Sequence, residues 1–243
     1  MAGAQAEPRI LSLRLLTAAP LEKMKAFYHK TLGLTVLKED SNELTIGGGA
    51  TPITFVGAKP DQGNPFYHFA FNIPENKLLD ARAWQLERTE LLPIFPRLRD
   101  PDFPDDVVNF SHWNAHSVFF LDPAGNVLEY IARHDLSNRA DGPFSKKDIL
   151  YASEIAFVVD DVSAMSSGLQ ETFELDQYRQ GGDSFRALGD ELGLLLVFGR
   201  GRNMSFGYDE PKLADVFPTS ALIRSEPATK YTARDFPYEI TSR

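Results

Sequence analysis

Residues 117–133, with the sequence SVFFLDPAGNVLEYIAR, decide the fold of this chain. Two apolar runs flank a DPAGN turn, in which the proline fixes its own φ and Gly125 can adopt a positive φ. This combination predicts a β-hairpin. Alternation along its second strand places Val127, Glu129 and Ile131 on one face.

Glu129 is therefore either buried or on a solvated face. A buried carboxylate must be paired, protonated or bound to a metal, because burying an isolated charge is costly. A solvated face would leave the two β-branched neighbours of Glu129 exposed beside it. We favour the inward orientation, which makes Glu129 a candidate functional carboxylate.

The composition limits the classes of function. The 243 residues, 43% of them hydrophobic, fit one large domain or two small ones. A net charge of −9 argues against nucleic acids and anionic membrane surfaces as partners. No apolar run approaches the roughly 20 residues of a membrane helix. The absence of cysteine excludes disulfides and thiolate metal sites. The first residues lack a signal-peptide pattern, so the expected location is the cytoplasm.

One order of elements occurs repeatedly along the chain. The first unit is a predicted strand, helix and three strands, at residues 9–18, 20–33, 34–38, 43–46 and 52–56. The second has a strand at 66–73, a helix to about residue 88, a Pro- and Asp-rich loop at 93–106 and the hairpin. The third has a strand at 153–159, a helix at 162–173 and strands near 177–180, 185–188 and 194–198.

These repeats predict how the chain divides. Two βαβββ units can pair into an open barrel with a concave face for a ligand. We expect residues 1–134 to form a domain of two such units and residues 135–149 to be a linker. Residues 150–243 would form a third βαβββ-like unit followed by a degenerate segment in which no helix is evident.

Three sequences resemble the vicinal oxygen chelate superfamily: FYHKTLGL at 27–34, YHFAFNI at 67–73 and FLDPAGNVLE at 120–129. This superfamily includes glyoxalase I, bleomycin-binding proteins, extradiol dioxygenases and fosfomycin-resistance thiol transferases. The resemblance covers residues 9–133 well and 150–200 loosely. It implies an α+β fold in which repeated βαβββ units form a glyoxalase-like open barrel.

The resemblance also implies a metal site. Metal-using members take one ligand from the first strand of unit one and two from the first and last strands of unit two. His68 and Glu129 match the second pair, and nitrogen and oxygen donors suit Fe²⁺, Mn²⁺, Zn²⁺ or Ni²⁺. The first-strand position falls on Leu13, which cannot bind a metal. The alternative is a metal-free cavity in which His68 is hydrogen-bonded to Glu129.

The third unit offers a replacement ligand. Glu154 occupies the first-strand position of that unit, and units in this superfamily can pair in swapped arrangements. Our hypothesis is that Glu154 reaches the cavity as the third metal ligand. The alternative is that the third unit has its own half-barrel and Glu154 bonds locally.

Further candidates lie near the hairpin. His116 lies on the strand that pairs with the Glu129 strand, where it is either a general acid or base or a solvated strand end. Phe66, Trp113 and Phe119 are candidates for lining a substrate cavity.

Two functions compete. The first is a divalent-metal-dependent enzyme on a small oxygenated substrate, of the dioxygenase, lyase/isomerase or transferase type. The alternative is a metal-free small-molecule binding protein of the bleomycin-resistance type, for which Leu13 is the argument and in which an acidic protein suits a cationic ligand. We lean towards the enzyme. A third option is that the third unit serves as a dimerising or lid element. A dimerising role would make the protein a homodimer.

Overall fold

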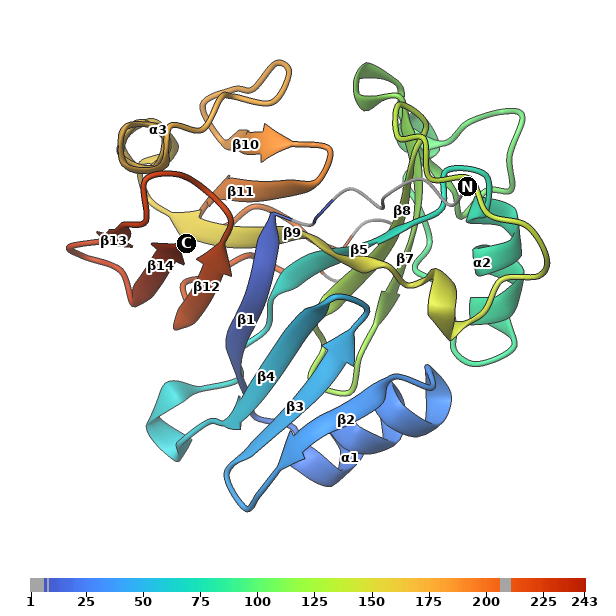
Figure 1. Ribbon diagram of the computed structural model, residues 1–243, viewed down its shortest axis with the longest axis horizontal. Coiled ribbons are helices and arrows are strands. Elements are labelled where there is room, and N and C mark those ends of the chain that lie inside the picture. The colour runs from blue at the N-terminus through green and yellow to red at the C-terminus, as the bar shows by residue number, and fades with distance from the viewer. Residues whose placement is uncertain (1–6, 8, 206–210) are drawn as a thin grey trace.

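The computed structural model describes residue 7 and residues 9–205 and 211–243. Their strands form two curled seven-stranded sheets (Figure 1). Sheet A has the order β13-β14-β12-β1-β4-β3-β2, and sheet B has the order β10-β11-β9-β5-β8-β7-β6. The structure confirms the α+β fold of repeated βαβββ units.

The elements have the following bounds. Sheet A contains β1 (Ile10–Thr17), β2 (Thr35–Glu39), β3 (Glu43–Gly48), β4 (Thr51–Gly57), β12 (Thr219–Ile223), β13 (Lys230–Thr232) and β14 (Tyr238–Ser242). Sheet B contains β5 (His68–Ile73), β6 (Val108–Phe110), β7 (Ala115–Leu121), β8 (Val127–Arg133), β9 (Tyr151–Val159), β10 (Phe185–Asp190) and β11 (Gly193–Gly199). The helices are α1 (Leu21–Lys25), α2 (Leu78–Leu86) and α3 (Val162–Phe173), and α1 continues as a π-helical segment, Ala26–Thr31.

The strand pairing is nested along the sequence. The second unit continues into the third, because β5 pairs antiparallel with β9. The first unit pairs instead with the degenerate segment, because β1 is antiparallel to β12. Each sheet also joins the first and last strands of a unit in parallel, β1 with β4 and β5 with β8. The two sheets therefore have the same internal topology.

One face of each sheet packs into a shared apolar core. This core contains the buried residues of all three helices, such as Met24, Leu78 and Leu169, together with Phe55 of sheet A and Phe71 of sheet B. The opposite face of sheet B forms a separate apolar cluster that includes Phe119, Val127 and Leu196. Within the described chain, no helix combines the length and apolar character needed to cross a membrane.

The hairpin turn connects the three sequences that suggested the fold. Asp122 Oδ1 accepts the backbone N–H of Ala124 at 2.8 Å, and Oδ2 accepts the Tyr28 hydroxyl at 2.7 Å. Asn126 Oδ1 accepts the backbone N–H of Tyr67 at 2.8 Å. Gly125 has φ +78, which a residue with a side chain rarely adopts. The turn thus fixes unit one against the strands of unit two.

Candidate metal centre

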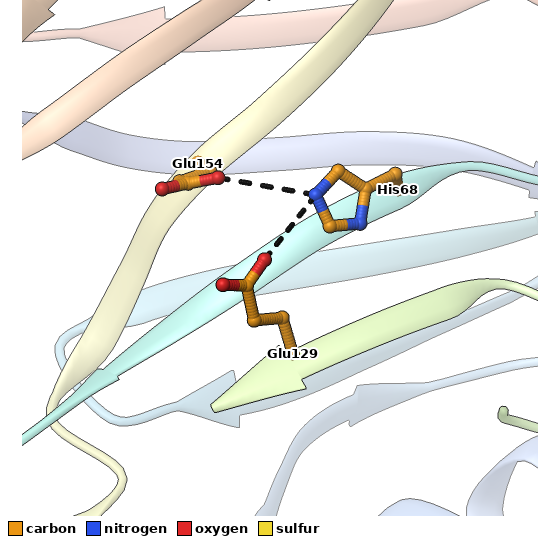
Figure 2. A group of neighbouring side chains, drawn as sticks. All are labelled: His68, Glu129 and Glu154. Atoms are coloured by element: carbon orange, nitrogen blue, oxygen red, sulfur yellow. Dashed lines mark ion pairs between the residues drawn. The ribbon is translucent and has the colours of Figure 1, made fainter. Parts of the chain in front are cut away.

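Three ionisable side chains of sheet B meet in one place (Figure 2). They lie on the face of the sheet opposite to the one that packs with the helices into the shared core. Ala70 of β5 pairs with Glu129 of β8 on one side and with Glu154 of β9 on the other. His68 lies two residues before Ala70 and so shares its face. Because Ala70 has only a methyl group, the side chains around it have room to converge.

The donor atoms of this cluster are close together. His68 Nε2 lies 3.4 Å from Glu129 Oε2 and 3.9 Å from Glu154 Oε2. One ligand atom from each of the three residues lies within 4.8 Å of the others. All three residues are buried, with exposed fractions of 7%, 2% and 2% for His68, Glu129 and Glu154. The structure therefore brings the predicted His68, Glu129 and Glu154 into one group.

The imidazole is oriented by the backbone. His68 Nδ1 lies 3.0 Å from the carbonyl oxygen of Val127, which can only accept, so Nδ1 donates. In the neutral ring, Nε2 then carries the lone pair and points towards the carboxylates, as in metal-binding histidines. Burial by itself lowers the pKa of His68, but Glu154 and Glu129 outweigh it and raise the pKa above its usual range.

The two carboxylates have different environments. Burial raises the pKa of Glu129 well above its usual range, and the charge of Glu154 raises that pKa further. Glu129 Oε1 is buried and lacks a hydrogen-bond partner among the described residues. Glu154 Oε1 accepts a hydrogen bond from Nη2 of the fully buried Arg133. Glu154 is thus the carboxylate held by an arginine, and Glu129 is the one with an unpartnered oxygen.

The donor set fits a divalent transition metal. Metal–ligand bonds of about 2.0–2.2 Å separate ligand atoms by roughly 3–4.4 Å, so the observed spacing needs only small side-chain movements. One nitrogen and two carboxylate donors suit Fe²⁺, Mn²⁺, Zn²⁺ or Ni²⁺. The unpartnered Glu129 Oε1 is the kind of buried polar atom that a bound ion or its ligands would satisfy.

A cavity of about 380 Å³ lies over the cluster. Trp113 and Phe119 line it, as predicted, and Phe95 and Leu98 show that the loop at 93–106 forms part of its wall. Phe66 does not line this cavity. It faces a neighbouring space of about 20 Å³, which is too small for a substrate.

His116 is not part of this site. Phe119 of β7 pairs with Glu129, so alternation turns Ser117 towards the cavity and His116 to the opposite face. There its Nε2 lies 2.9 Å from Asp100 Oδ2 and its Nδ1 lies 2.8 Å from Nε2 of His134. This placement corrects the expectation that His116 acts as a general acid or base beside His68.

The assignment of the first-strand ligand position to Leu13 was also wrong. Leu13 is in the shared core and lies in sheet A, which does not carry the cluster. β1 and β5 both end three residues after Arg14 and Ala70, respectively. Arg14 is therefore the counterpart of Ala70, and Ser12 is the counterpart of His68. A shift of one residue in counting along a strand moves the assigned position from one face of the sheet to the other.

Sequence reasoning missed four residues around the site. Alternation along β11 could have found Phe198, which shares a face with Leu196 in the cavity wall. Arg133 ends the hairpin strand and could have been read as facing the same side as Glu129. Arg97 lies in a short 3-10 helix, Pro96–Leu98, and Arg202 lies in the loop after β11, so no periodic pattern marks either residue.

Comparisons with known proteins agree with this fold. Residues 11–130 match the family model described as the Glyoxalase/Bleomycin resistance protein/Dioxygenase superfamily. A solved structure of a proposed dioxygenase from Bacillus subtilis subsp. subtilis str. 168 is similar with a TM-score of 0.60 and 15% identity, covering 98% of this chain and 86% of that chain. A glyoxalase I mutant from Zea mays gives a TM-score of 0.54 and 12% identity, covering 97% and 94%. No curated protein sequence matches the chain. At these identities the structural likeness shows the fold alone.

Proposed function

This chain belongs, through residues 11–130, to the Glyoxalase/Bleomycin resistance protein/Dioxygenase superfamily, and from that premise we propose that it is a divalent-metal-dependent enzyme acting on a small oxygenated substrate. One observation carries the proposal. His68, Glu129 and Glu154 are buried and converge at a cavity large enough for a small molecule. Buried carboxylates are costly unless positive charge compensates them; Arg133 compensates Glu154, and a bound cation would compensate Glu129.

In this proposal, His68 Nε2 and one oxygen each of Glu129 and Glu154 hold the ion. A divalent ion bound there supplies Lewis-acid polarisation of substrate oxygens. The Val127 carbonyl fixes the orientation of the imidazole, and Arg133 fixes Glu154. Arg133 is a positioning residue because it acts through Glu154.

Glu129 has a second role in the proposed reaction. Its Oε1 is buried and has no hydrogen-bond partner among the described residues, so this oxygen is available to accept a proton. We assign to Oε1 the task of taking a proton from the bound substrate. Trp113 and Phe119 form apolar walls that exclude water from this transfer. The type of reaction, whether dioxygenase, lyase/isomerase or transferase, depends on the ion and the substrate.

The alternative of a metal-free binding protein loses its main argument. That alternative depended on Leu13 in place of a ligand. Leu13 belongs to the other sheet, and Glu154 fills the position beside His68 and Glu129. The metal-dependent function therefore has the stronger support.

Metal content measured by elemental analysis tests the proposal. Tag-free protein, incubated with Fe²⁺, Mn²⁺, Zn²⁺ and Ni²⁺ in turn, is expected to retain near-stoichiometric metal. The variants His68→Ala, Glu129→Gln and Glu154→Gln should each lose roughly 10- to 100-fold or more in affinity. Glu154→Gln keeps an oxygen that can accept from Arg133 but removes the carboxylate charge, so its fold is compared with wild type by circular dichroism. Thr54→Ala, at the position of sheet A that corresponds to Glu129, is the matched control and should bind like wild type. Failure to retain any of the four ions would refute the metal-dependent function.

A further inference from the structure

The fixed positive charges in the cavity wall belong to two arginines, Arg97 and Arg202. Neither side chain has an ion pair or hydrogen bond among the described residues. Most arginines elsewhere in the described chain do form ion pairs with carboxylates, for example those at positions 9, 82, 99, 139 and 200. In a chain of net charge −9, two unpaired arginines on one cavity wall stand out.

Arg202 is held by aromatic rings. Its Cζ lies 5.1 Å from the ring centroid of Phe185 and 5.1 Å from that of Phe198. Such stacking uses the face of the guanidinium and leaves its N–H groups, which lie in its plane, free to donate. Partial loss of hydration lowers the pKa of Arg202, although the residue as a whole stays exposed. A carboxylate that enters the cavity can therefore reach the N–H groups in that plane and bind them in a bidentate way.

Phe198 links Arg202 to the candidate metal centre. Its ring is stacked on the His68 imidazole, with centroids 6.1 Å apart and an interplanar angle of 13°. Arg97 repeats the arrangement on the loop side, with Cζ 4.7 Å from the ring centroid of Phe95. The cavity is therefore lined by the carboxylates and histidine of the cluster, by two arginines and by aromatic rings, and Phe198 contacts both His68 and Arg202.

We propose that Arg202, assisted by Arg97, binds the carboxylate of an aromatic substrate. The aromatic body of the substrate lies along Phe198, Trp113 and Phe119, and its oxygenated end points to His68, Glu129 and Glu154. This orientation rests on the proposed function, whereas binding of the carboxylate does not.

This inference reverses the expectation from net charge. An overall charge of −9 favours a cationic ligand in the long-range field. A bound ligand, however, interacts mainly with the charges that line the cavity, because distant surface charges are screened by salt over about 8–10 Å. The positive charges nearest the aromatic walls favour an anionic group at that end.

An isosteric pair of probes tests the inference: 2-naphthoate and 2-naphthamide, which differ in charge and hardly in shape. A Trp84→Phe background leaves Trp113 in the cavity wall as the single tryptophan, so its fluorescence reports binding. Metal-free protein is expected to bind the carboxylate at least about 10-fold more tightly than the amide. Arg202→Gln should weaken 2-naphthoate by roughly 10- to 100-fold and leave 2-naphthamide within about twofold. Arg97→Gln should have a smaller effect of the same kind.

Arg234→Gln is the matched control, since Arg234 is an exposed arginine outside the cavity and its loss should change neither affinity. Equal affinities of wild type for the two probes, or equal losses for both in Arg202→Gln, would overturn the inference. Affinity for 2-naphthoate that vanishes on metal removal but survives Arg202→Gln would also overturn it, because the carboxylate would then bind the metal. A preference for 2-naphthoate that depends on Arg202, in protein that takes up no metal, would uphold the inference while the proposed function fails.

Discussion

Sheets A and B have the same strand order and the same strand directions, yet only sheet B carries buried ionisable residues at its centre. In sheet B, Ala70 is flanked by Glu129 and Glu154. In sheet A, its counterpart Arg14 is flanked by Thr54 and Ser220. The Arg14 side chain is 51% exposed, whereas both glutamates are buried.

This difference shows that the strand order alone does not determine where a functional site forms. The fold supplies two concave faces, but only one combines a small central residue, convergent donors and a covering loop. An exposed face can satisfy its polar groups with water, so sheet A needs no special partners. A buried face must satisfy them internally, and sheet B does so with charges that suit a cation.

The largest expected difference between the sheets comes from Glu154→Ala. It leaves Arg133 buried without its carboxylate, which should lower the free energy of unfolding by about 3–5 kcal/mol. Ser220→Ala, at the corresponding position of sheet A, should change it by less than about 0.5 kcal/mol. Urea denaturation in the presence of EDTA measures both values. A loss below about 1 kcal/mol for Glu154→Ala would contradict the view that Arg133 depends on it.

The second difference concerns the hairpin turns of the two sheets. Gly49, between β3 and β4, has φ +63, and a Cβ there would lie 2.0 Å from the carbonyl oxygen of Leu150. Gly125, between β7 and β8, has φ +78, but a Cβ would meet only the mobile tip of Lys212 at 2.7 Å. Alanine should therefore cost about 1 kcal/mol at Gly125 and at least about 2 kcal/mol at Gly49.

Thermal unfolding of both glycine variants gives the comparison, with wild type measured beside them. Equal effects at the two turns would mean that the segment carrying Leu150 moves aside without cost. That result would remove the close contact between the sheet A hairpin and the backbone of Ile149 and Leu150 as a source of stability.

The third difference is the pH dependence of stability. Glu129 has a raised pKa when folded, so the folded metal-free protein holds a proton that the unfolded chain releases above about pH 4.3. Its stability contribution is present at low pH and is lost as the pH rises through the raised pKa. His68 has a raised pKa too and acts in the same direction. Stability of the metal-free protein should therefore fall between about pH 4.3 and the raised pKa of about 8, by about 1.4 kcal/mol per unit of pKa shift.

Denaturation curves from about pH 5 to about pH 9 test whether the free energy of unfolding falls as the pH rises. This range lies above the unperturbed glutamate pKa near 4.3. Glu129→Gln should flatten the profile. Thr54→Glu on the open face of sheet A should leave the profile as in wild type, because an exposed carboxylate ionises normally. A wild-type stability that rises with pH over this range would show that Glu129 is ionised in the metal-free protein.

The smallest difference is expected from Arg14→Ala. Arg14 forms an exposed ion pair with Glu43 at 2.8 Å, and such pairs contribute about 0–1 kcal/mol. Urea denaturation at low and high salt should show a loss of about 0.5 kcal/mol that salt reduces. A loss of 3 kcal/mol would mean that the open face of sheet A is covered in solution.

Local sequence predicted the elements well where periodicity was strong. The helix at 162–173 has the bounds of α3, and the hairpin has the turn expected of DPAGN. Alternation also placed His68 and Glu129 on one face. These features depend on neighbouring residues, so a single sequence contains them.

The sequence could not show in the same way which distant segment completes each sheet. Which strand of residues 150–243 pairs with β5 and which pairs with β1 depends on contacts between distant segments. The prediction placed the first-strand ligand at Leu13 because it assumed that units one and two share a sheet. Leu13 is a core residue of the other sheet. The stacking of Arg202 on Phe185 and Phe198 is equally non-local, because the contact follows from the loop after β11 and not from a repeat.

The nested pairing has a consequence for the order in which the chain can fold during translation. All strands of sheet B lie within residues 68–199, so that sheet can form from one continuous stretch as it leaves the ribosome. Sheet A must wait for residues 219–242, and Arg9 donates to the carbonyl of Arg224 across 215 positions. Until then the edge of β1 is an unpaired strand, which invites association with other nascent chains. The half of the molecule with the candidate chemistry is complete before the half without it can close.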